Sequence, residues 1–582
     1  MAKTIIKHLP EMAKARSRVD SPRTFRNDIE PSPRLKEFAK GRKYLIKTFG
    51  CQANVRDEEI MAGMLEKAGF VKSPSEEEAS LVIINTCAVR ENAEEKVYGE
   101  IGKFKANATK DPNFILCLCG CMMQEEGVAV KLREIYHHVS IVFGTHNIDK
   151  LLDMLDEKIA TKKSLIDVLS FSGDIVENLP STRLDSYKAY VNITYGCDKF
   201  CTYCIVPYTR GRERSRAKED ILKECKELVE QGYQEITLLG QNVNSYGKDF
   251  KNGTSFAGIL EDVAKLGVPR LRFMTSHPWD FTDEMLDVIA KYPNIMKCIH
   301  LPVQSGNDEI LRLMGRRYTR EDYLSLVRKI RDRMPECAIT TDIIVGFPNE
   351  TEEQFLDTLS LCKEVGYDAA FTFIYSPRKG TPAARIEDNV SPKDKHDRFN
   401  RLVNVVEEGV SSHSQKMVGK TYMVLVDGPS KKDSDVLSGY AENGKLIHFR
   451  GPVQLKGSIV PVKVTEDKTF SMFGELQIDP ILFLAEKLRT AMDEEPLLKN
   501  YLAAKKAAEE DASLGKLRDE IESAQRAMMN FAASHEDTKF ASKRKEYLSL
   551  MKEYESHPLI LNLTSAKEEL EPMLTLVAEA LR

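Results

Sequence analysis

Three cysteines at C-x3-C-x2-C spacing are the residues of this sequence best suited to do chemistry. Cys197, Cys201 and Cys204 lie in one short loop, directly after a strand-like run at residues 189–194. Soft thiolates are the ligands that iron–sulfur clusters take, and three of them hold three irons of a 4Fe–4S cube. The fourth iron is then open to a small chelating molecule. The alternatives are three half-buried cysteines or a partial zinc site, although zinc motifs favour two C-x2-C pairs.

A second set of cysteines follows three separate apolar runs. Cys51, Cys87 and Cys121 each stand at the end of a run that reads as a strand, at residues 43–48, 81–84 and 114–119. Helical patterns lie between the runs, which is typical of a parallel α/β sheet. Because ligands bind beyond the carboxyl ends of such strands, the three thiols can converge. The sequence therefore predicts a second cluster site.

Two neighbouring cysteines complicate this assignment. Cys117 and Cys119 alternate with Cys121 along one strand, so all three face the same side. We assign Cys121 to the site because Gly120 breaks the strand and presents the next thiol. We predict that Cys117 and Cys119 are small buried hydrophobes.

Repeated strand and helix patterns continue from Ser186. Six such units predict a partial β/α barrel whose active face lies at the strand ends, with strands at residues 189–194, 235–239, 270–275, 298–302, 338–345 and 369–374. Several strand ends are polar. Each one alone could be a capping turn, but together they predict a pocket for the molecule that binds the open iron, lined by Gln241, Asn242, Gln304, Ser305 and Gly346.

An arginine-rich segment follows the first cysteine loop. Tyr208 precedes Arg210, Arg212 and Arg214. Four arginines within seven residues, next to a tyrosine, suit contact with phosphate and stacking on an exposed base. We therefore assign Tyr208, Arg210, Arg212 and Arg214 to the binding of an RNA substrate. The alternative is a solvated charged loop.

Length and composition indicate a chain of several domains. It has 582 residues and twelve cysteines, without an apolar run long enough to span a membrane and without a secretory signal. This predicts a cytoplasmic protein that uses its thiols for metal binding. The predicted parts are a flexible leader, a parallel α/β domain, a linker, the barrel, a small all-β barrel and a helical appendage, at residues 1–40, 41–155, 156–185, 186–412, 413–478 and 479–582.

The helical appendage has its own character. It carries 15 basic and 20 acidic residues, so the net charge of −5 of the whole chain resides there. Apolar residues at 3-4 spacing run from Leu514 to Phe531 and from Leu559 to Val577. Two long amphipathic helices with narrow seams predict an antiparallel hairpin or a coiled coil that binds a helical partner.

Residues 41–478 resemble the MiaB branch of the methylthiotransferases, which are radical S-adenosylmethionine (SAM) enzymes. The second cysteine set stands in the family's motifs, Gly-Cys-Gln-x-Asn, Asn-Thr-Cys and Gly-Cys-x-x-Gln. The branch is indicated by the runs at residues 205–213, 426–432 and 443–444. Residues 414–478 look like a TRAM domain, the family's RNA-binding module. The helical appendage departs from this family and resembles the YlbF/YmcA proteins, in segments 497–501 and 557–559.

The resemblance implies an activity and its cofactors. Cys197, Cys201 and Cys204 would hold the cluster that binds SAM, and the second set an auxiliary 4Fe–4S cluster, with no catalytic residue beyond these ligands. The enzyme would transfer a methylthio group to C2 of N6-isopentenyladenosine beside the tRNA anticodon. A sulfur source and a flavodoxin- or ferredoxin-like electron donor are implied. The alternatives are an enzyme for a ribosomal-protein aspartate or another hypermodified adenosine, and a non-catalytic iron–sulfur sensor that binds RNA.

Overall fold

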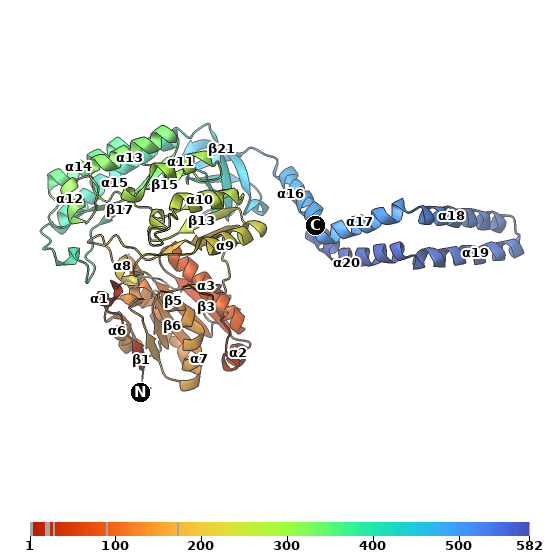
Figure 1. Ribbon diagram of the computed structural model, residues 1–582, viewed down its shortest axis with the longest axis horizontal. Coiled ribbons are helices and arrows are strands. Elements are labelled where there is room, and N and C mark those ends of the chain that lie inside the picture. The colour runs from red at the N-terminus through yellow and green to blue at the C-terminus, as the bar shows by residue number, and fades with distance from the viewer. Residues whose placement is uncertain (1–3, 18–23, 27–28, 89–90, 172–173, 581–582) are drawn as a thin grey trace. The chain divides into compact units, whose positions relative to one another are not determined.

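The computed structural model describes residues 4–17, 24–26, 29–88, 91–171 and 174–580, and it divides into two compact units (Figure 1). The first unit is Met1–Gln477 and the second is Ile478–Arg582. No helix in the described ranges combines the length and the apolar character needed to cross a bilayer.

A seven-stranded parallel sheet forms the start of the first unit. From one edge to the other its strands are β1 (Ile5–His8), β8 (Leu165–Asp167), β7 (Ile141–Phe143), β6, β5, β3 and β4 (Val71–Lys72). The three strands that carry the second cysteine set are adjacent: β3 (Lys43–Thr48), β5 (Leu81–Thr86) and β6 (Ile115–Gly120). Both faces of β5 and β6 are buried, which explains their continuous apolar sequence. The predicted parallel α/β domain is confirmed.

The N-terminal residues differ from the flexible leader predicted for them. Ile5–His8 forms β1, which pairs with β8 (Leu165–Asp167) at the edge of the sheet. Pro33–Ala39 forms α2, capped by the Ser32 side chain. Both elements are short and gain their stability from long-range partners, so local patterning does not reveal them. β8 is also short and lies in the predicted linker, yet it belongs to the sheet because it pairs with β1 and β7.

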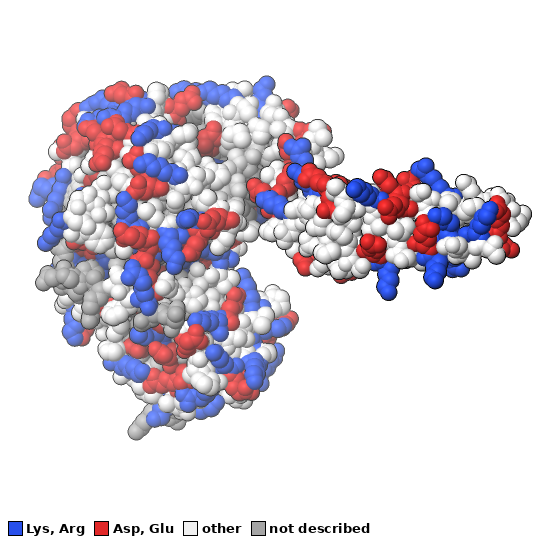
Figure 2. Space-filling model, turned by 45° about the vertical axis from the view of Figure 1, so that its right-hand side comes forward, with Lys and Arg blue, Asp and Glu red and all other residues white. Residues whose placement is uncertain are grey.

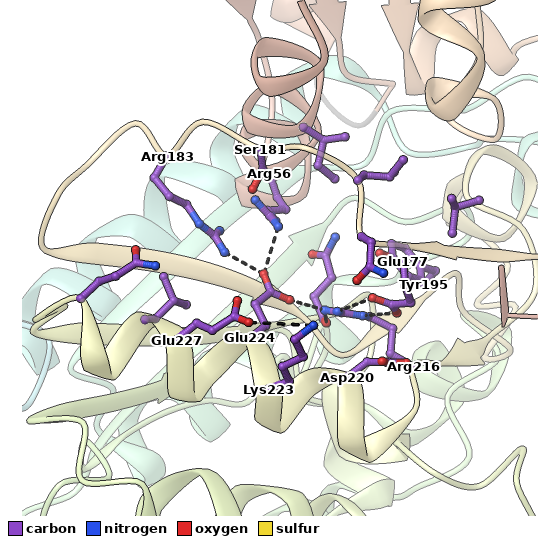
Figure 3. A pocket seen from close by; sticks show the side chains of 17 residues that line it. Arg56, Glu177, Ser181, Arg183, Tyr195, Arg216, Asp220, Lys223, Glu224 and Glu227 are labelled. Carbon is purple, nitrogen blue, oxygen red and sulfur yellow. Dashed lines mark hydrogen bonds and ion pairs between the residues drawn. The ribbon is translucent and has the colours of Figure 1, made fainter. Parts of the chain in front are cut away.

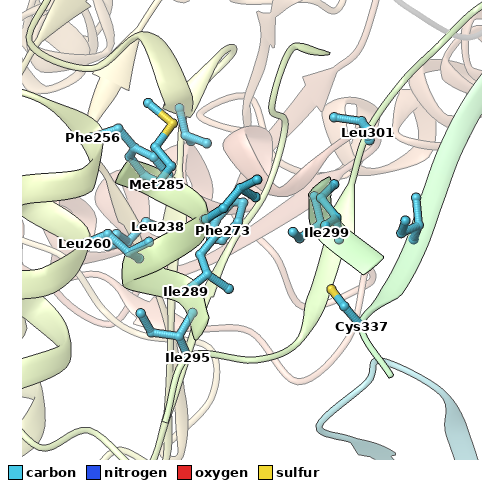
Figure 4. Packing of buried hydrophobic residues seen from close by; sticks show 14 of the residues in the cluster. Leu238, Phe256, Leu260, Phe273, Met285, Ile289, Ile295, Ile299, Leu301 and Cys337 are labelled. Carbon is cyan, nitrogen blue, oxygen red and sulfur yellow. The ribbon is translucent and has the colours of Figure 1, made fainter. Parts of the chain in front are cut away.

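Six parallel strands form the partial barrel that the sequence predicts. They make two three-stranded sheets: β10 (Lys188–Asn192), β13 (Glu235–Leu239) and β14 (Arg270–Phe273), then β15 (Cys298–His300), β16 (Ala338–Val345) and β17 (Ala369–Ile374). One face of these strands packs against the surrounding helices. Leu238, Phe273 and Ile299 belong to that core, together with helix residues such as Leu260 and Ile289 (Figure 4). The alternate residues of each strand therefore face the barrel lumen.

A closed five-stranded barrel ends the first unit, which confirms the predicted small all-β domain. Its order is β18-β19-β20-β22-β21, from β18 (Thr421–Pro429), β19 (Val436–Ala441), β20 (Leu446–Arg450), β21 (Ile459–Asp467) and β22 (Ser471–Leu476). It docks on the amino ends of the partial-barrel strands. Arg270 donates to the carbonyl oxygens of Tyr440 and Ala441 at 2.8 Å each, and Lys188 pairs with Asp427.

The second unit is entirely helical within its described residues. It consists of α16 (Pro480–Glu494), α17 (Pro496–Glu510), α18 (Ala512–Ala533), α19 (Asp537–Ser556) and α20 (Pro558–Ala580). α17 and α18 form one arm of this unit, and α19 and α20 form the other. The arms run antiparallel, so that α18 packs against α19 and α17 packs against α20. Acidic and basic side chains are interspersed on the face of this unit seen in Figure 2.

The hairpin prediction for this unit needs one correction. The two apolar seams lie on α18 and α20, which pair mainly with α19 and α17, although Leu514 and Ile560 at their starts share a buried cluster. Helix breaks at Asp511 and Pro558 divide each arm into two helices. Each seam therefore packs mainly on a helix that the sequence did not predict as its partner.

Candidate functional site

The three thiols of the second cysteine set meet at the carboxyl edge of the seven-stranded sheet. Cys51 is the N-cap residue of α3 (Gln52–Ala68), Cys87 follows β5, and Cys121 begins the 3-10 helix η1 (Cys121–Gln124). A Cβ added at Gly50 would lie 3.0 Å from Cys87 Cβ, so these two loops touch. Burial raises the pKa of Cys121 to about 11. The neighbouring thiols of Cys87 and Cys51 also raise this pKa, whereas the positive charge of Arg210 lowers it.

Two asparagines from the cysteine motifs hold these loops together. The Asn54 side-chain amide donates to Asn85 Oδ1 at 3.1 Å and to the Thr86 carbonyl at 2.9 Å, and Asn85 Nδ2 donates to the Asn54 carbonyl at 2.9 Å. Gly120 is required here, because its φ is +97° and an added Cβ would lie 2.3 Å from the Thr86 carbonyl oxygen. The motif residues beside the cysteines thus fix the positions of three strand ends.

The structure separates Cys121 from its two neighbours. Cys117 and Cys119 are fully buried in the core between the sheet and α3, where Cys119 Sγ lies 3.8 Å from Met61 Sδ. Cys121 instead leaves the strand and packs beside Ile205. Burial raises the pKa of Cys117 well above its usual value, as expected for a thiol in an apolar core.

The loop of the first cysteine set lies at the open end of the partial barrel. Cys197 N–H donates to the Gly211 carbonyl at 3.1 Å, and Thr202 N–H donates to the Met314 carbonyl at 2.9 Å. Gly196 has a φ of +72°, and an added Cβ would lie 2.2 Å from the Arg212 carbonyl oxygen. Burial raises the pKa of Cys197 and brings that of Cys204 to about 12. The loop is therefore held by the chain that follows it.

Both cysteine sets supply the soft thiol donors that iron–sulfur clusters take. Among the residues that the structure describes, no three His, Cys, Asp or Glu side chains come close enough to hold one metal ion. In a 4Fe–4S cube each thiolate binds a different iron, so the sulfurs stand further apart than around one ion. Each site offers three soft thiol donors on loops, and iron binding would release their protons.

Arg210 connects the two sites. It follows α8 (Val206–Thr209), directly after the loop of Cys204. Its Nε donates to Cys121 Sγ at 3.3 Å, and its Nη2 donates to Asp57 Oδ2 at 2.8 Å. Arg210 is buried, so its charge is balanced by the Asp57 carboxylate and not by water, while the Cys121 sulfur accepts one of its hydrogen bonds.

We expect Arg210→Met to loosen the auxiliary site. Residues that hydrogen-bond to metal ligands typically change metal affinity by about 10- to 100-fold. Iron retention against a chelator, measured with the other cysteine set replaced by alanine, should fall by a factor in this range. Two control variants are measured beside it. Arg210→Lys keeps the charge beside Asp57, and Arg212→Met removes a nearby charge that does not contact Cys121. Equal retention in all three variants would contradict a role for this contact.

The arginine-rich segment differs from both predictions for it. Tyr208, Arg210 and Arg214 are buried and so form neither an RNA-facing stripe nor a solvated loop. Tyr208 packs edge-on to Phe200, with ring centroids 6.3 Å apart. Arg212 is the exception: its side chain is 25% exposed and pairs with Asp198 at 2.7 Å. The segment packs between the sheet and the barrel, and this long-range contact buries charges that would otherwise be solvated.

The predicted pocket residues stand at the strand ends but differ in their surroundings. Asn242 donates to Asp280 Oδ2 at 2.7 Å. Ser305 is fully buried, with its hydroxyl 3.3 Å from Thr358 Oγ1 on α14 (Glu352–Val365). The Gly346 N–H is taken by the Glu350 carboxylate at 2.7 Å. Gln241 is partly exposed, whereas Gln304 is buried with a φ of +72°.

The polar strand end at residues 275–277 joins a buried cluster with Arg316 and Tyr203, two residues that the predicted pocket does not include. Arg316 donates to the hydroxyl of Tyr203, in the cysteine loop, at 3.0 Å, and to His277 Nε2. Burial, aided by Arg316, lowers the pKa of His277 far below its usual value. The neighbouring Thr275 has a φ of +68°, which is unusual for a β-branched residue and typical of functional sites. The polar run at residues 275–277 was the available signal.

Three arginines and two glutamates form a buried ion-pair network between the sheet domain and the barrel (Figure 3). Arg216 makes a bidentate pair with Glu177, at 2.6 and 2.7 Å, and donates to Glu224 at 2.8 Å. Glu224 also accepts from Arg183 at 2.7 Å and from Arg56 of α3 at 3.0 Å. The network borders a cavity of about 250 Å³ and joins the two domains that carry the cysteine sets.

Four family models match successive parts of the chain. They are the uncharacterized protein family UPF0004 over residues 43–144, the radical SAM superfamily over 191–362, the TRAM domain over 415–477, and control of competence regulator ComK, YlbF/YmcA, over 481–582. The first three cover the sheet domain, the partial barrel and the closed barrel. The fourth covers the helical unit.

Curated relatives match over nearly their whole length. The tRNA-2-methylthio-N(6)-dimethylallyladenosine synthase of Bacillus subtilis (strain 168) is 50% identical over 468 residues, which are 80% of this chain and 92% of the relative. The enzyme of the same name from Oceanobacillus iheyensis is 51% identical over 466 residues, 80% of this chain and 90% of the relative. The chain therefore belongs to the radical SAM methylthiotransferases, in the family of the tRNA-2-methylthio-N(6)-dimethylallyladenosine synthases.

Proposed function

We propose that the chain transfers a methylthio group to C2 of N6-dimethylallyladenosine beside the anticodon of tRNA, with SAM and two 4Fe–4S clusters. Relatives that are named for this activity share 50% and 51% sequence identity with the chain. The observation that carries the proposal is the contact between Arg210 and Cys121. It brings the loop after Cys204 against the other cysteine set, as the transfer of sulfur to an activated base requires.

Each part of the chain has a task in this reaction. The C2–H bond of adenine is not acidic, so the side chains cannot remove the hydrogen as a proton. When bound, the cluster on Cys197, Cys201 and Cys204 supplies the electron that cleaves SAM. The protein holds base, SAM and sulfur in contact with one another. The buried loop contacts and the ion-pair network keep the two sites in fixed relative positions.

The same proposal extends to partners and location. The RNA substrate would be held by the closed barrel, which matches the TRAM domain, and by the exposed part of Arg212. A flavodoxin- or ferredoxin-like protein would reduce the cluster, and a separate source would supply sulfur. We place the activity in the cytoplasm, where tRNA is modified.

Mass spectrometry of tRNA nucleosides tests the function. Cells that lack the protein should contain N6-dimethylallyladenosine without its 2-methylthio derivative, and the intact chain should restore that derivative. A chain with all three of Cys197, Cys201 and Cys204 replaced by alanine should not. Unchanged tRNA nucleosides in the deletion strain would refute the proposal. A mass change on a ribosomal-protein aspartate would then identify the nearest alternative.

The helical unit is expected to be dispensable for turnover. It forms a compact unit of its own, contains no cysteine and carries the excess negative charge of the chain, which should repel tRNA. We propose that it binds a helical protein partner. A chain ending at Gln477 should keep the melting temperature of the first unit and modify tRNA in vitro at an unchanged rate. An unstable or inactive truncated chain would make the unit part of the catalytic body.

A further inference from the structure

Two phenylalanines on β17 stand exposed in the lumen of the partial barrel. Ala370 and Ile374 pack against the helix-side core, so Phe371 and Phe373 point to the opposite side. Their exposed fractions are 56% and 40%. β17 is an edge strand of its three-stranded sheet, and no other strand of the six has two large exposed apolar side chains.

The residues beside them are polar and face the same lumen. Asp342 on β16 is the direct neighbour of Phe371 in the sheet register. His300 on β15 lies edge-on to Phe371, with ring centroids 6.2 Å apart, and its Nε2 is 3.4 Å from Asp342 Oδ2. Ile299 and Leu301 point to the helix side (Figure 4), which places His300 in the lumen. The phenyl rings thus form an apolar strip next to a hydrogen-bonding pair.

This combination fits one part of the proposed substrate. A dimethylallyl group is a branched five-carbon hydrocarbon attached to a base with polar edges. Burial of apolar surface gains about 25 cal/mol per Å². The phenyl rings would also be shielded from water when the dimethylallyl group binds. An unmodified adenosine would leave the strip exposed.

We propose that Phe371 and Phe373 form the wall that receives the dimethylallyl arm of the target adenosine and so select RNA that is already prenylated. The inference rests on the proposed function and adds the residues that decide specificity.

Binding of two anticodon stem-loop RNAs tests this directly. One RNA carries N6-dimethylallyladenosine and the other carries adenosine at the same position. The full-length, iron-loaded chain should bind the prenylated RNA at least about tenfold more tightly, because the apolar arm leaves water on the phenyl wall. In Phe371→Ala/Phe373→Ala this preference should fall to about twofold, while affinity for the unmodified RNA stays the same.

Two control variants make the result specific. Leu356→Ala removes an exposed apolar side chain from α14, on the helix side of the barrel, and should leave the preference unchanged. Phe371→Leu/Phe373→Leu keeps an apolar wall and should retain most of the preference. Melting temperature and iron content should be equal in all variants, because the replaced side chains are exposed.

The outcomes separate the two proposals. If the wild-type chain prefers the prenylated RNA and the double alanine variant prefers it equally, the inference is overturned and the proposed function stands. If the variant loses affinity for both RNAs alike, the rings bind RNA without reading the prenyl group, and the inference is likewise overturned. If the wild-type chain does not distinguish the RNAs, the proposed substrate fails and the inference fails with it.

Discussion

Replacing Cys197, Cys201 and Cys204 together with alanine is expected to lower the iron content from about eight to about four atoms per chain and to abolish SAM cleavage. The three thiols share one loop, pinned through Gly211 and Met314, so their loss should remove one whole cluster. Iron analysis after anaerobic reconstitution and chromatography of SAM cleavage products measure the two effects.

The complementary triple variant shows whether the two sites are independent. Replacing Cys51, Cys87 and Cys121 should also leave about four irons, but SAM cleavage should persist because the other loop is intact. Cys117→Ala is the matched control, since this thiol is buried in the apolar core. A chain that keeps all its iron without Cys51, Cys87 and Cys121 would show that the auxiliary site is assigned wrongly.

Arg216→Met is expected to destabilise the first unit by about 3–5 kcal/mol, the usual cost of removing one partner of a buried ion pair. Both Glu177 and Glu224 would lose their main counter-charge inside the domain interface. The midpoint of urea unfolding measures the effect. Arg26→Met is the matched control, because Arg26 makes a similar pair with Asp220 at the exposed surface and should matter much less.

The pH dependence of stability gives a second measure of the same network. Burial alone would raise the pKa of Glu224, but Arg216, Arg56 and Arg183 outweigh it and lower the pKa to about 2. A glutamate in the unfolded chain has a pKa of about 4.3. The stabilisation is therefore complete above about pH 5 and is lost as the pH falls toward 2. Glu224→Gln should flatten this loss, and an equal slope in both proteins would contradict the assignment.

Local patterns in the sequence determined the elements and the cysteine sets. Three strands have the same bounds in the structure as the apolar runs predict, at residues 235–239, 338–345 and 369–374. Alternating or continuous apolar residues are a local pattern, so a short window of sequence is enough to detect them. The cysteine spacing and the asparagines in the cysteine motifs could likewise be recognised from the sequence. The expected ligand roles of the six cysteines remain predictions.

Only the tertiary structure decided what surrounds those elements. Arg210 and Arg214 were predicted to contact RNA, with a solvated loop as the alternative. The contact between the sheet domain and the barrel instead buries both side chains and pairs Arg210 with Asp57, far away in the sequence. β1 became a strand because β8 offers it a free edge. The exposure of Phe371 depends on the open lumen of the partial barrel, which no local pattern encodes. Burial and pairing are properties of the partner as much as of the residue, so a sequence window that contains one member of a pair cannot fix them.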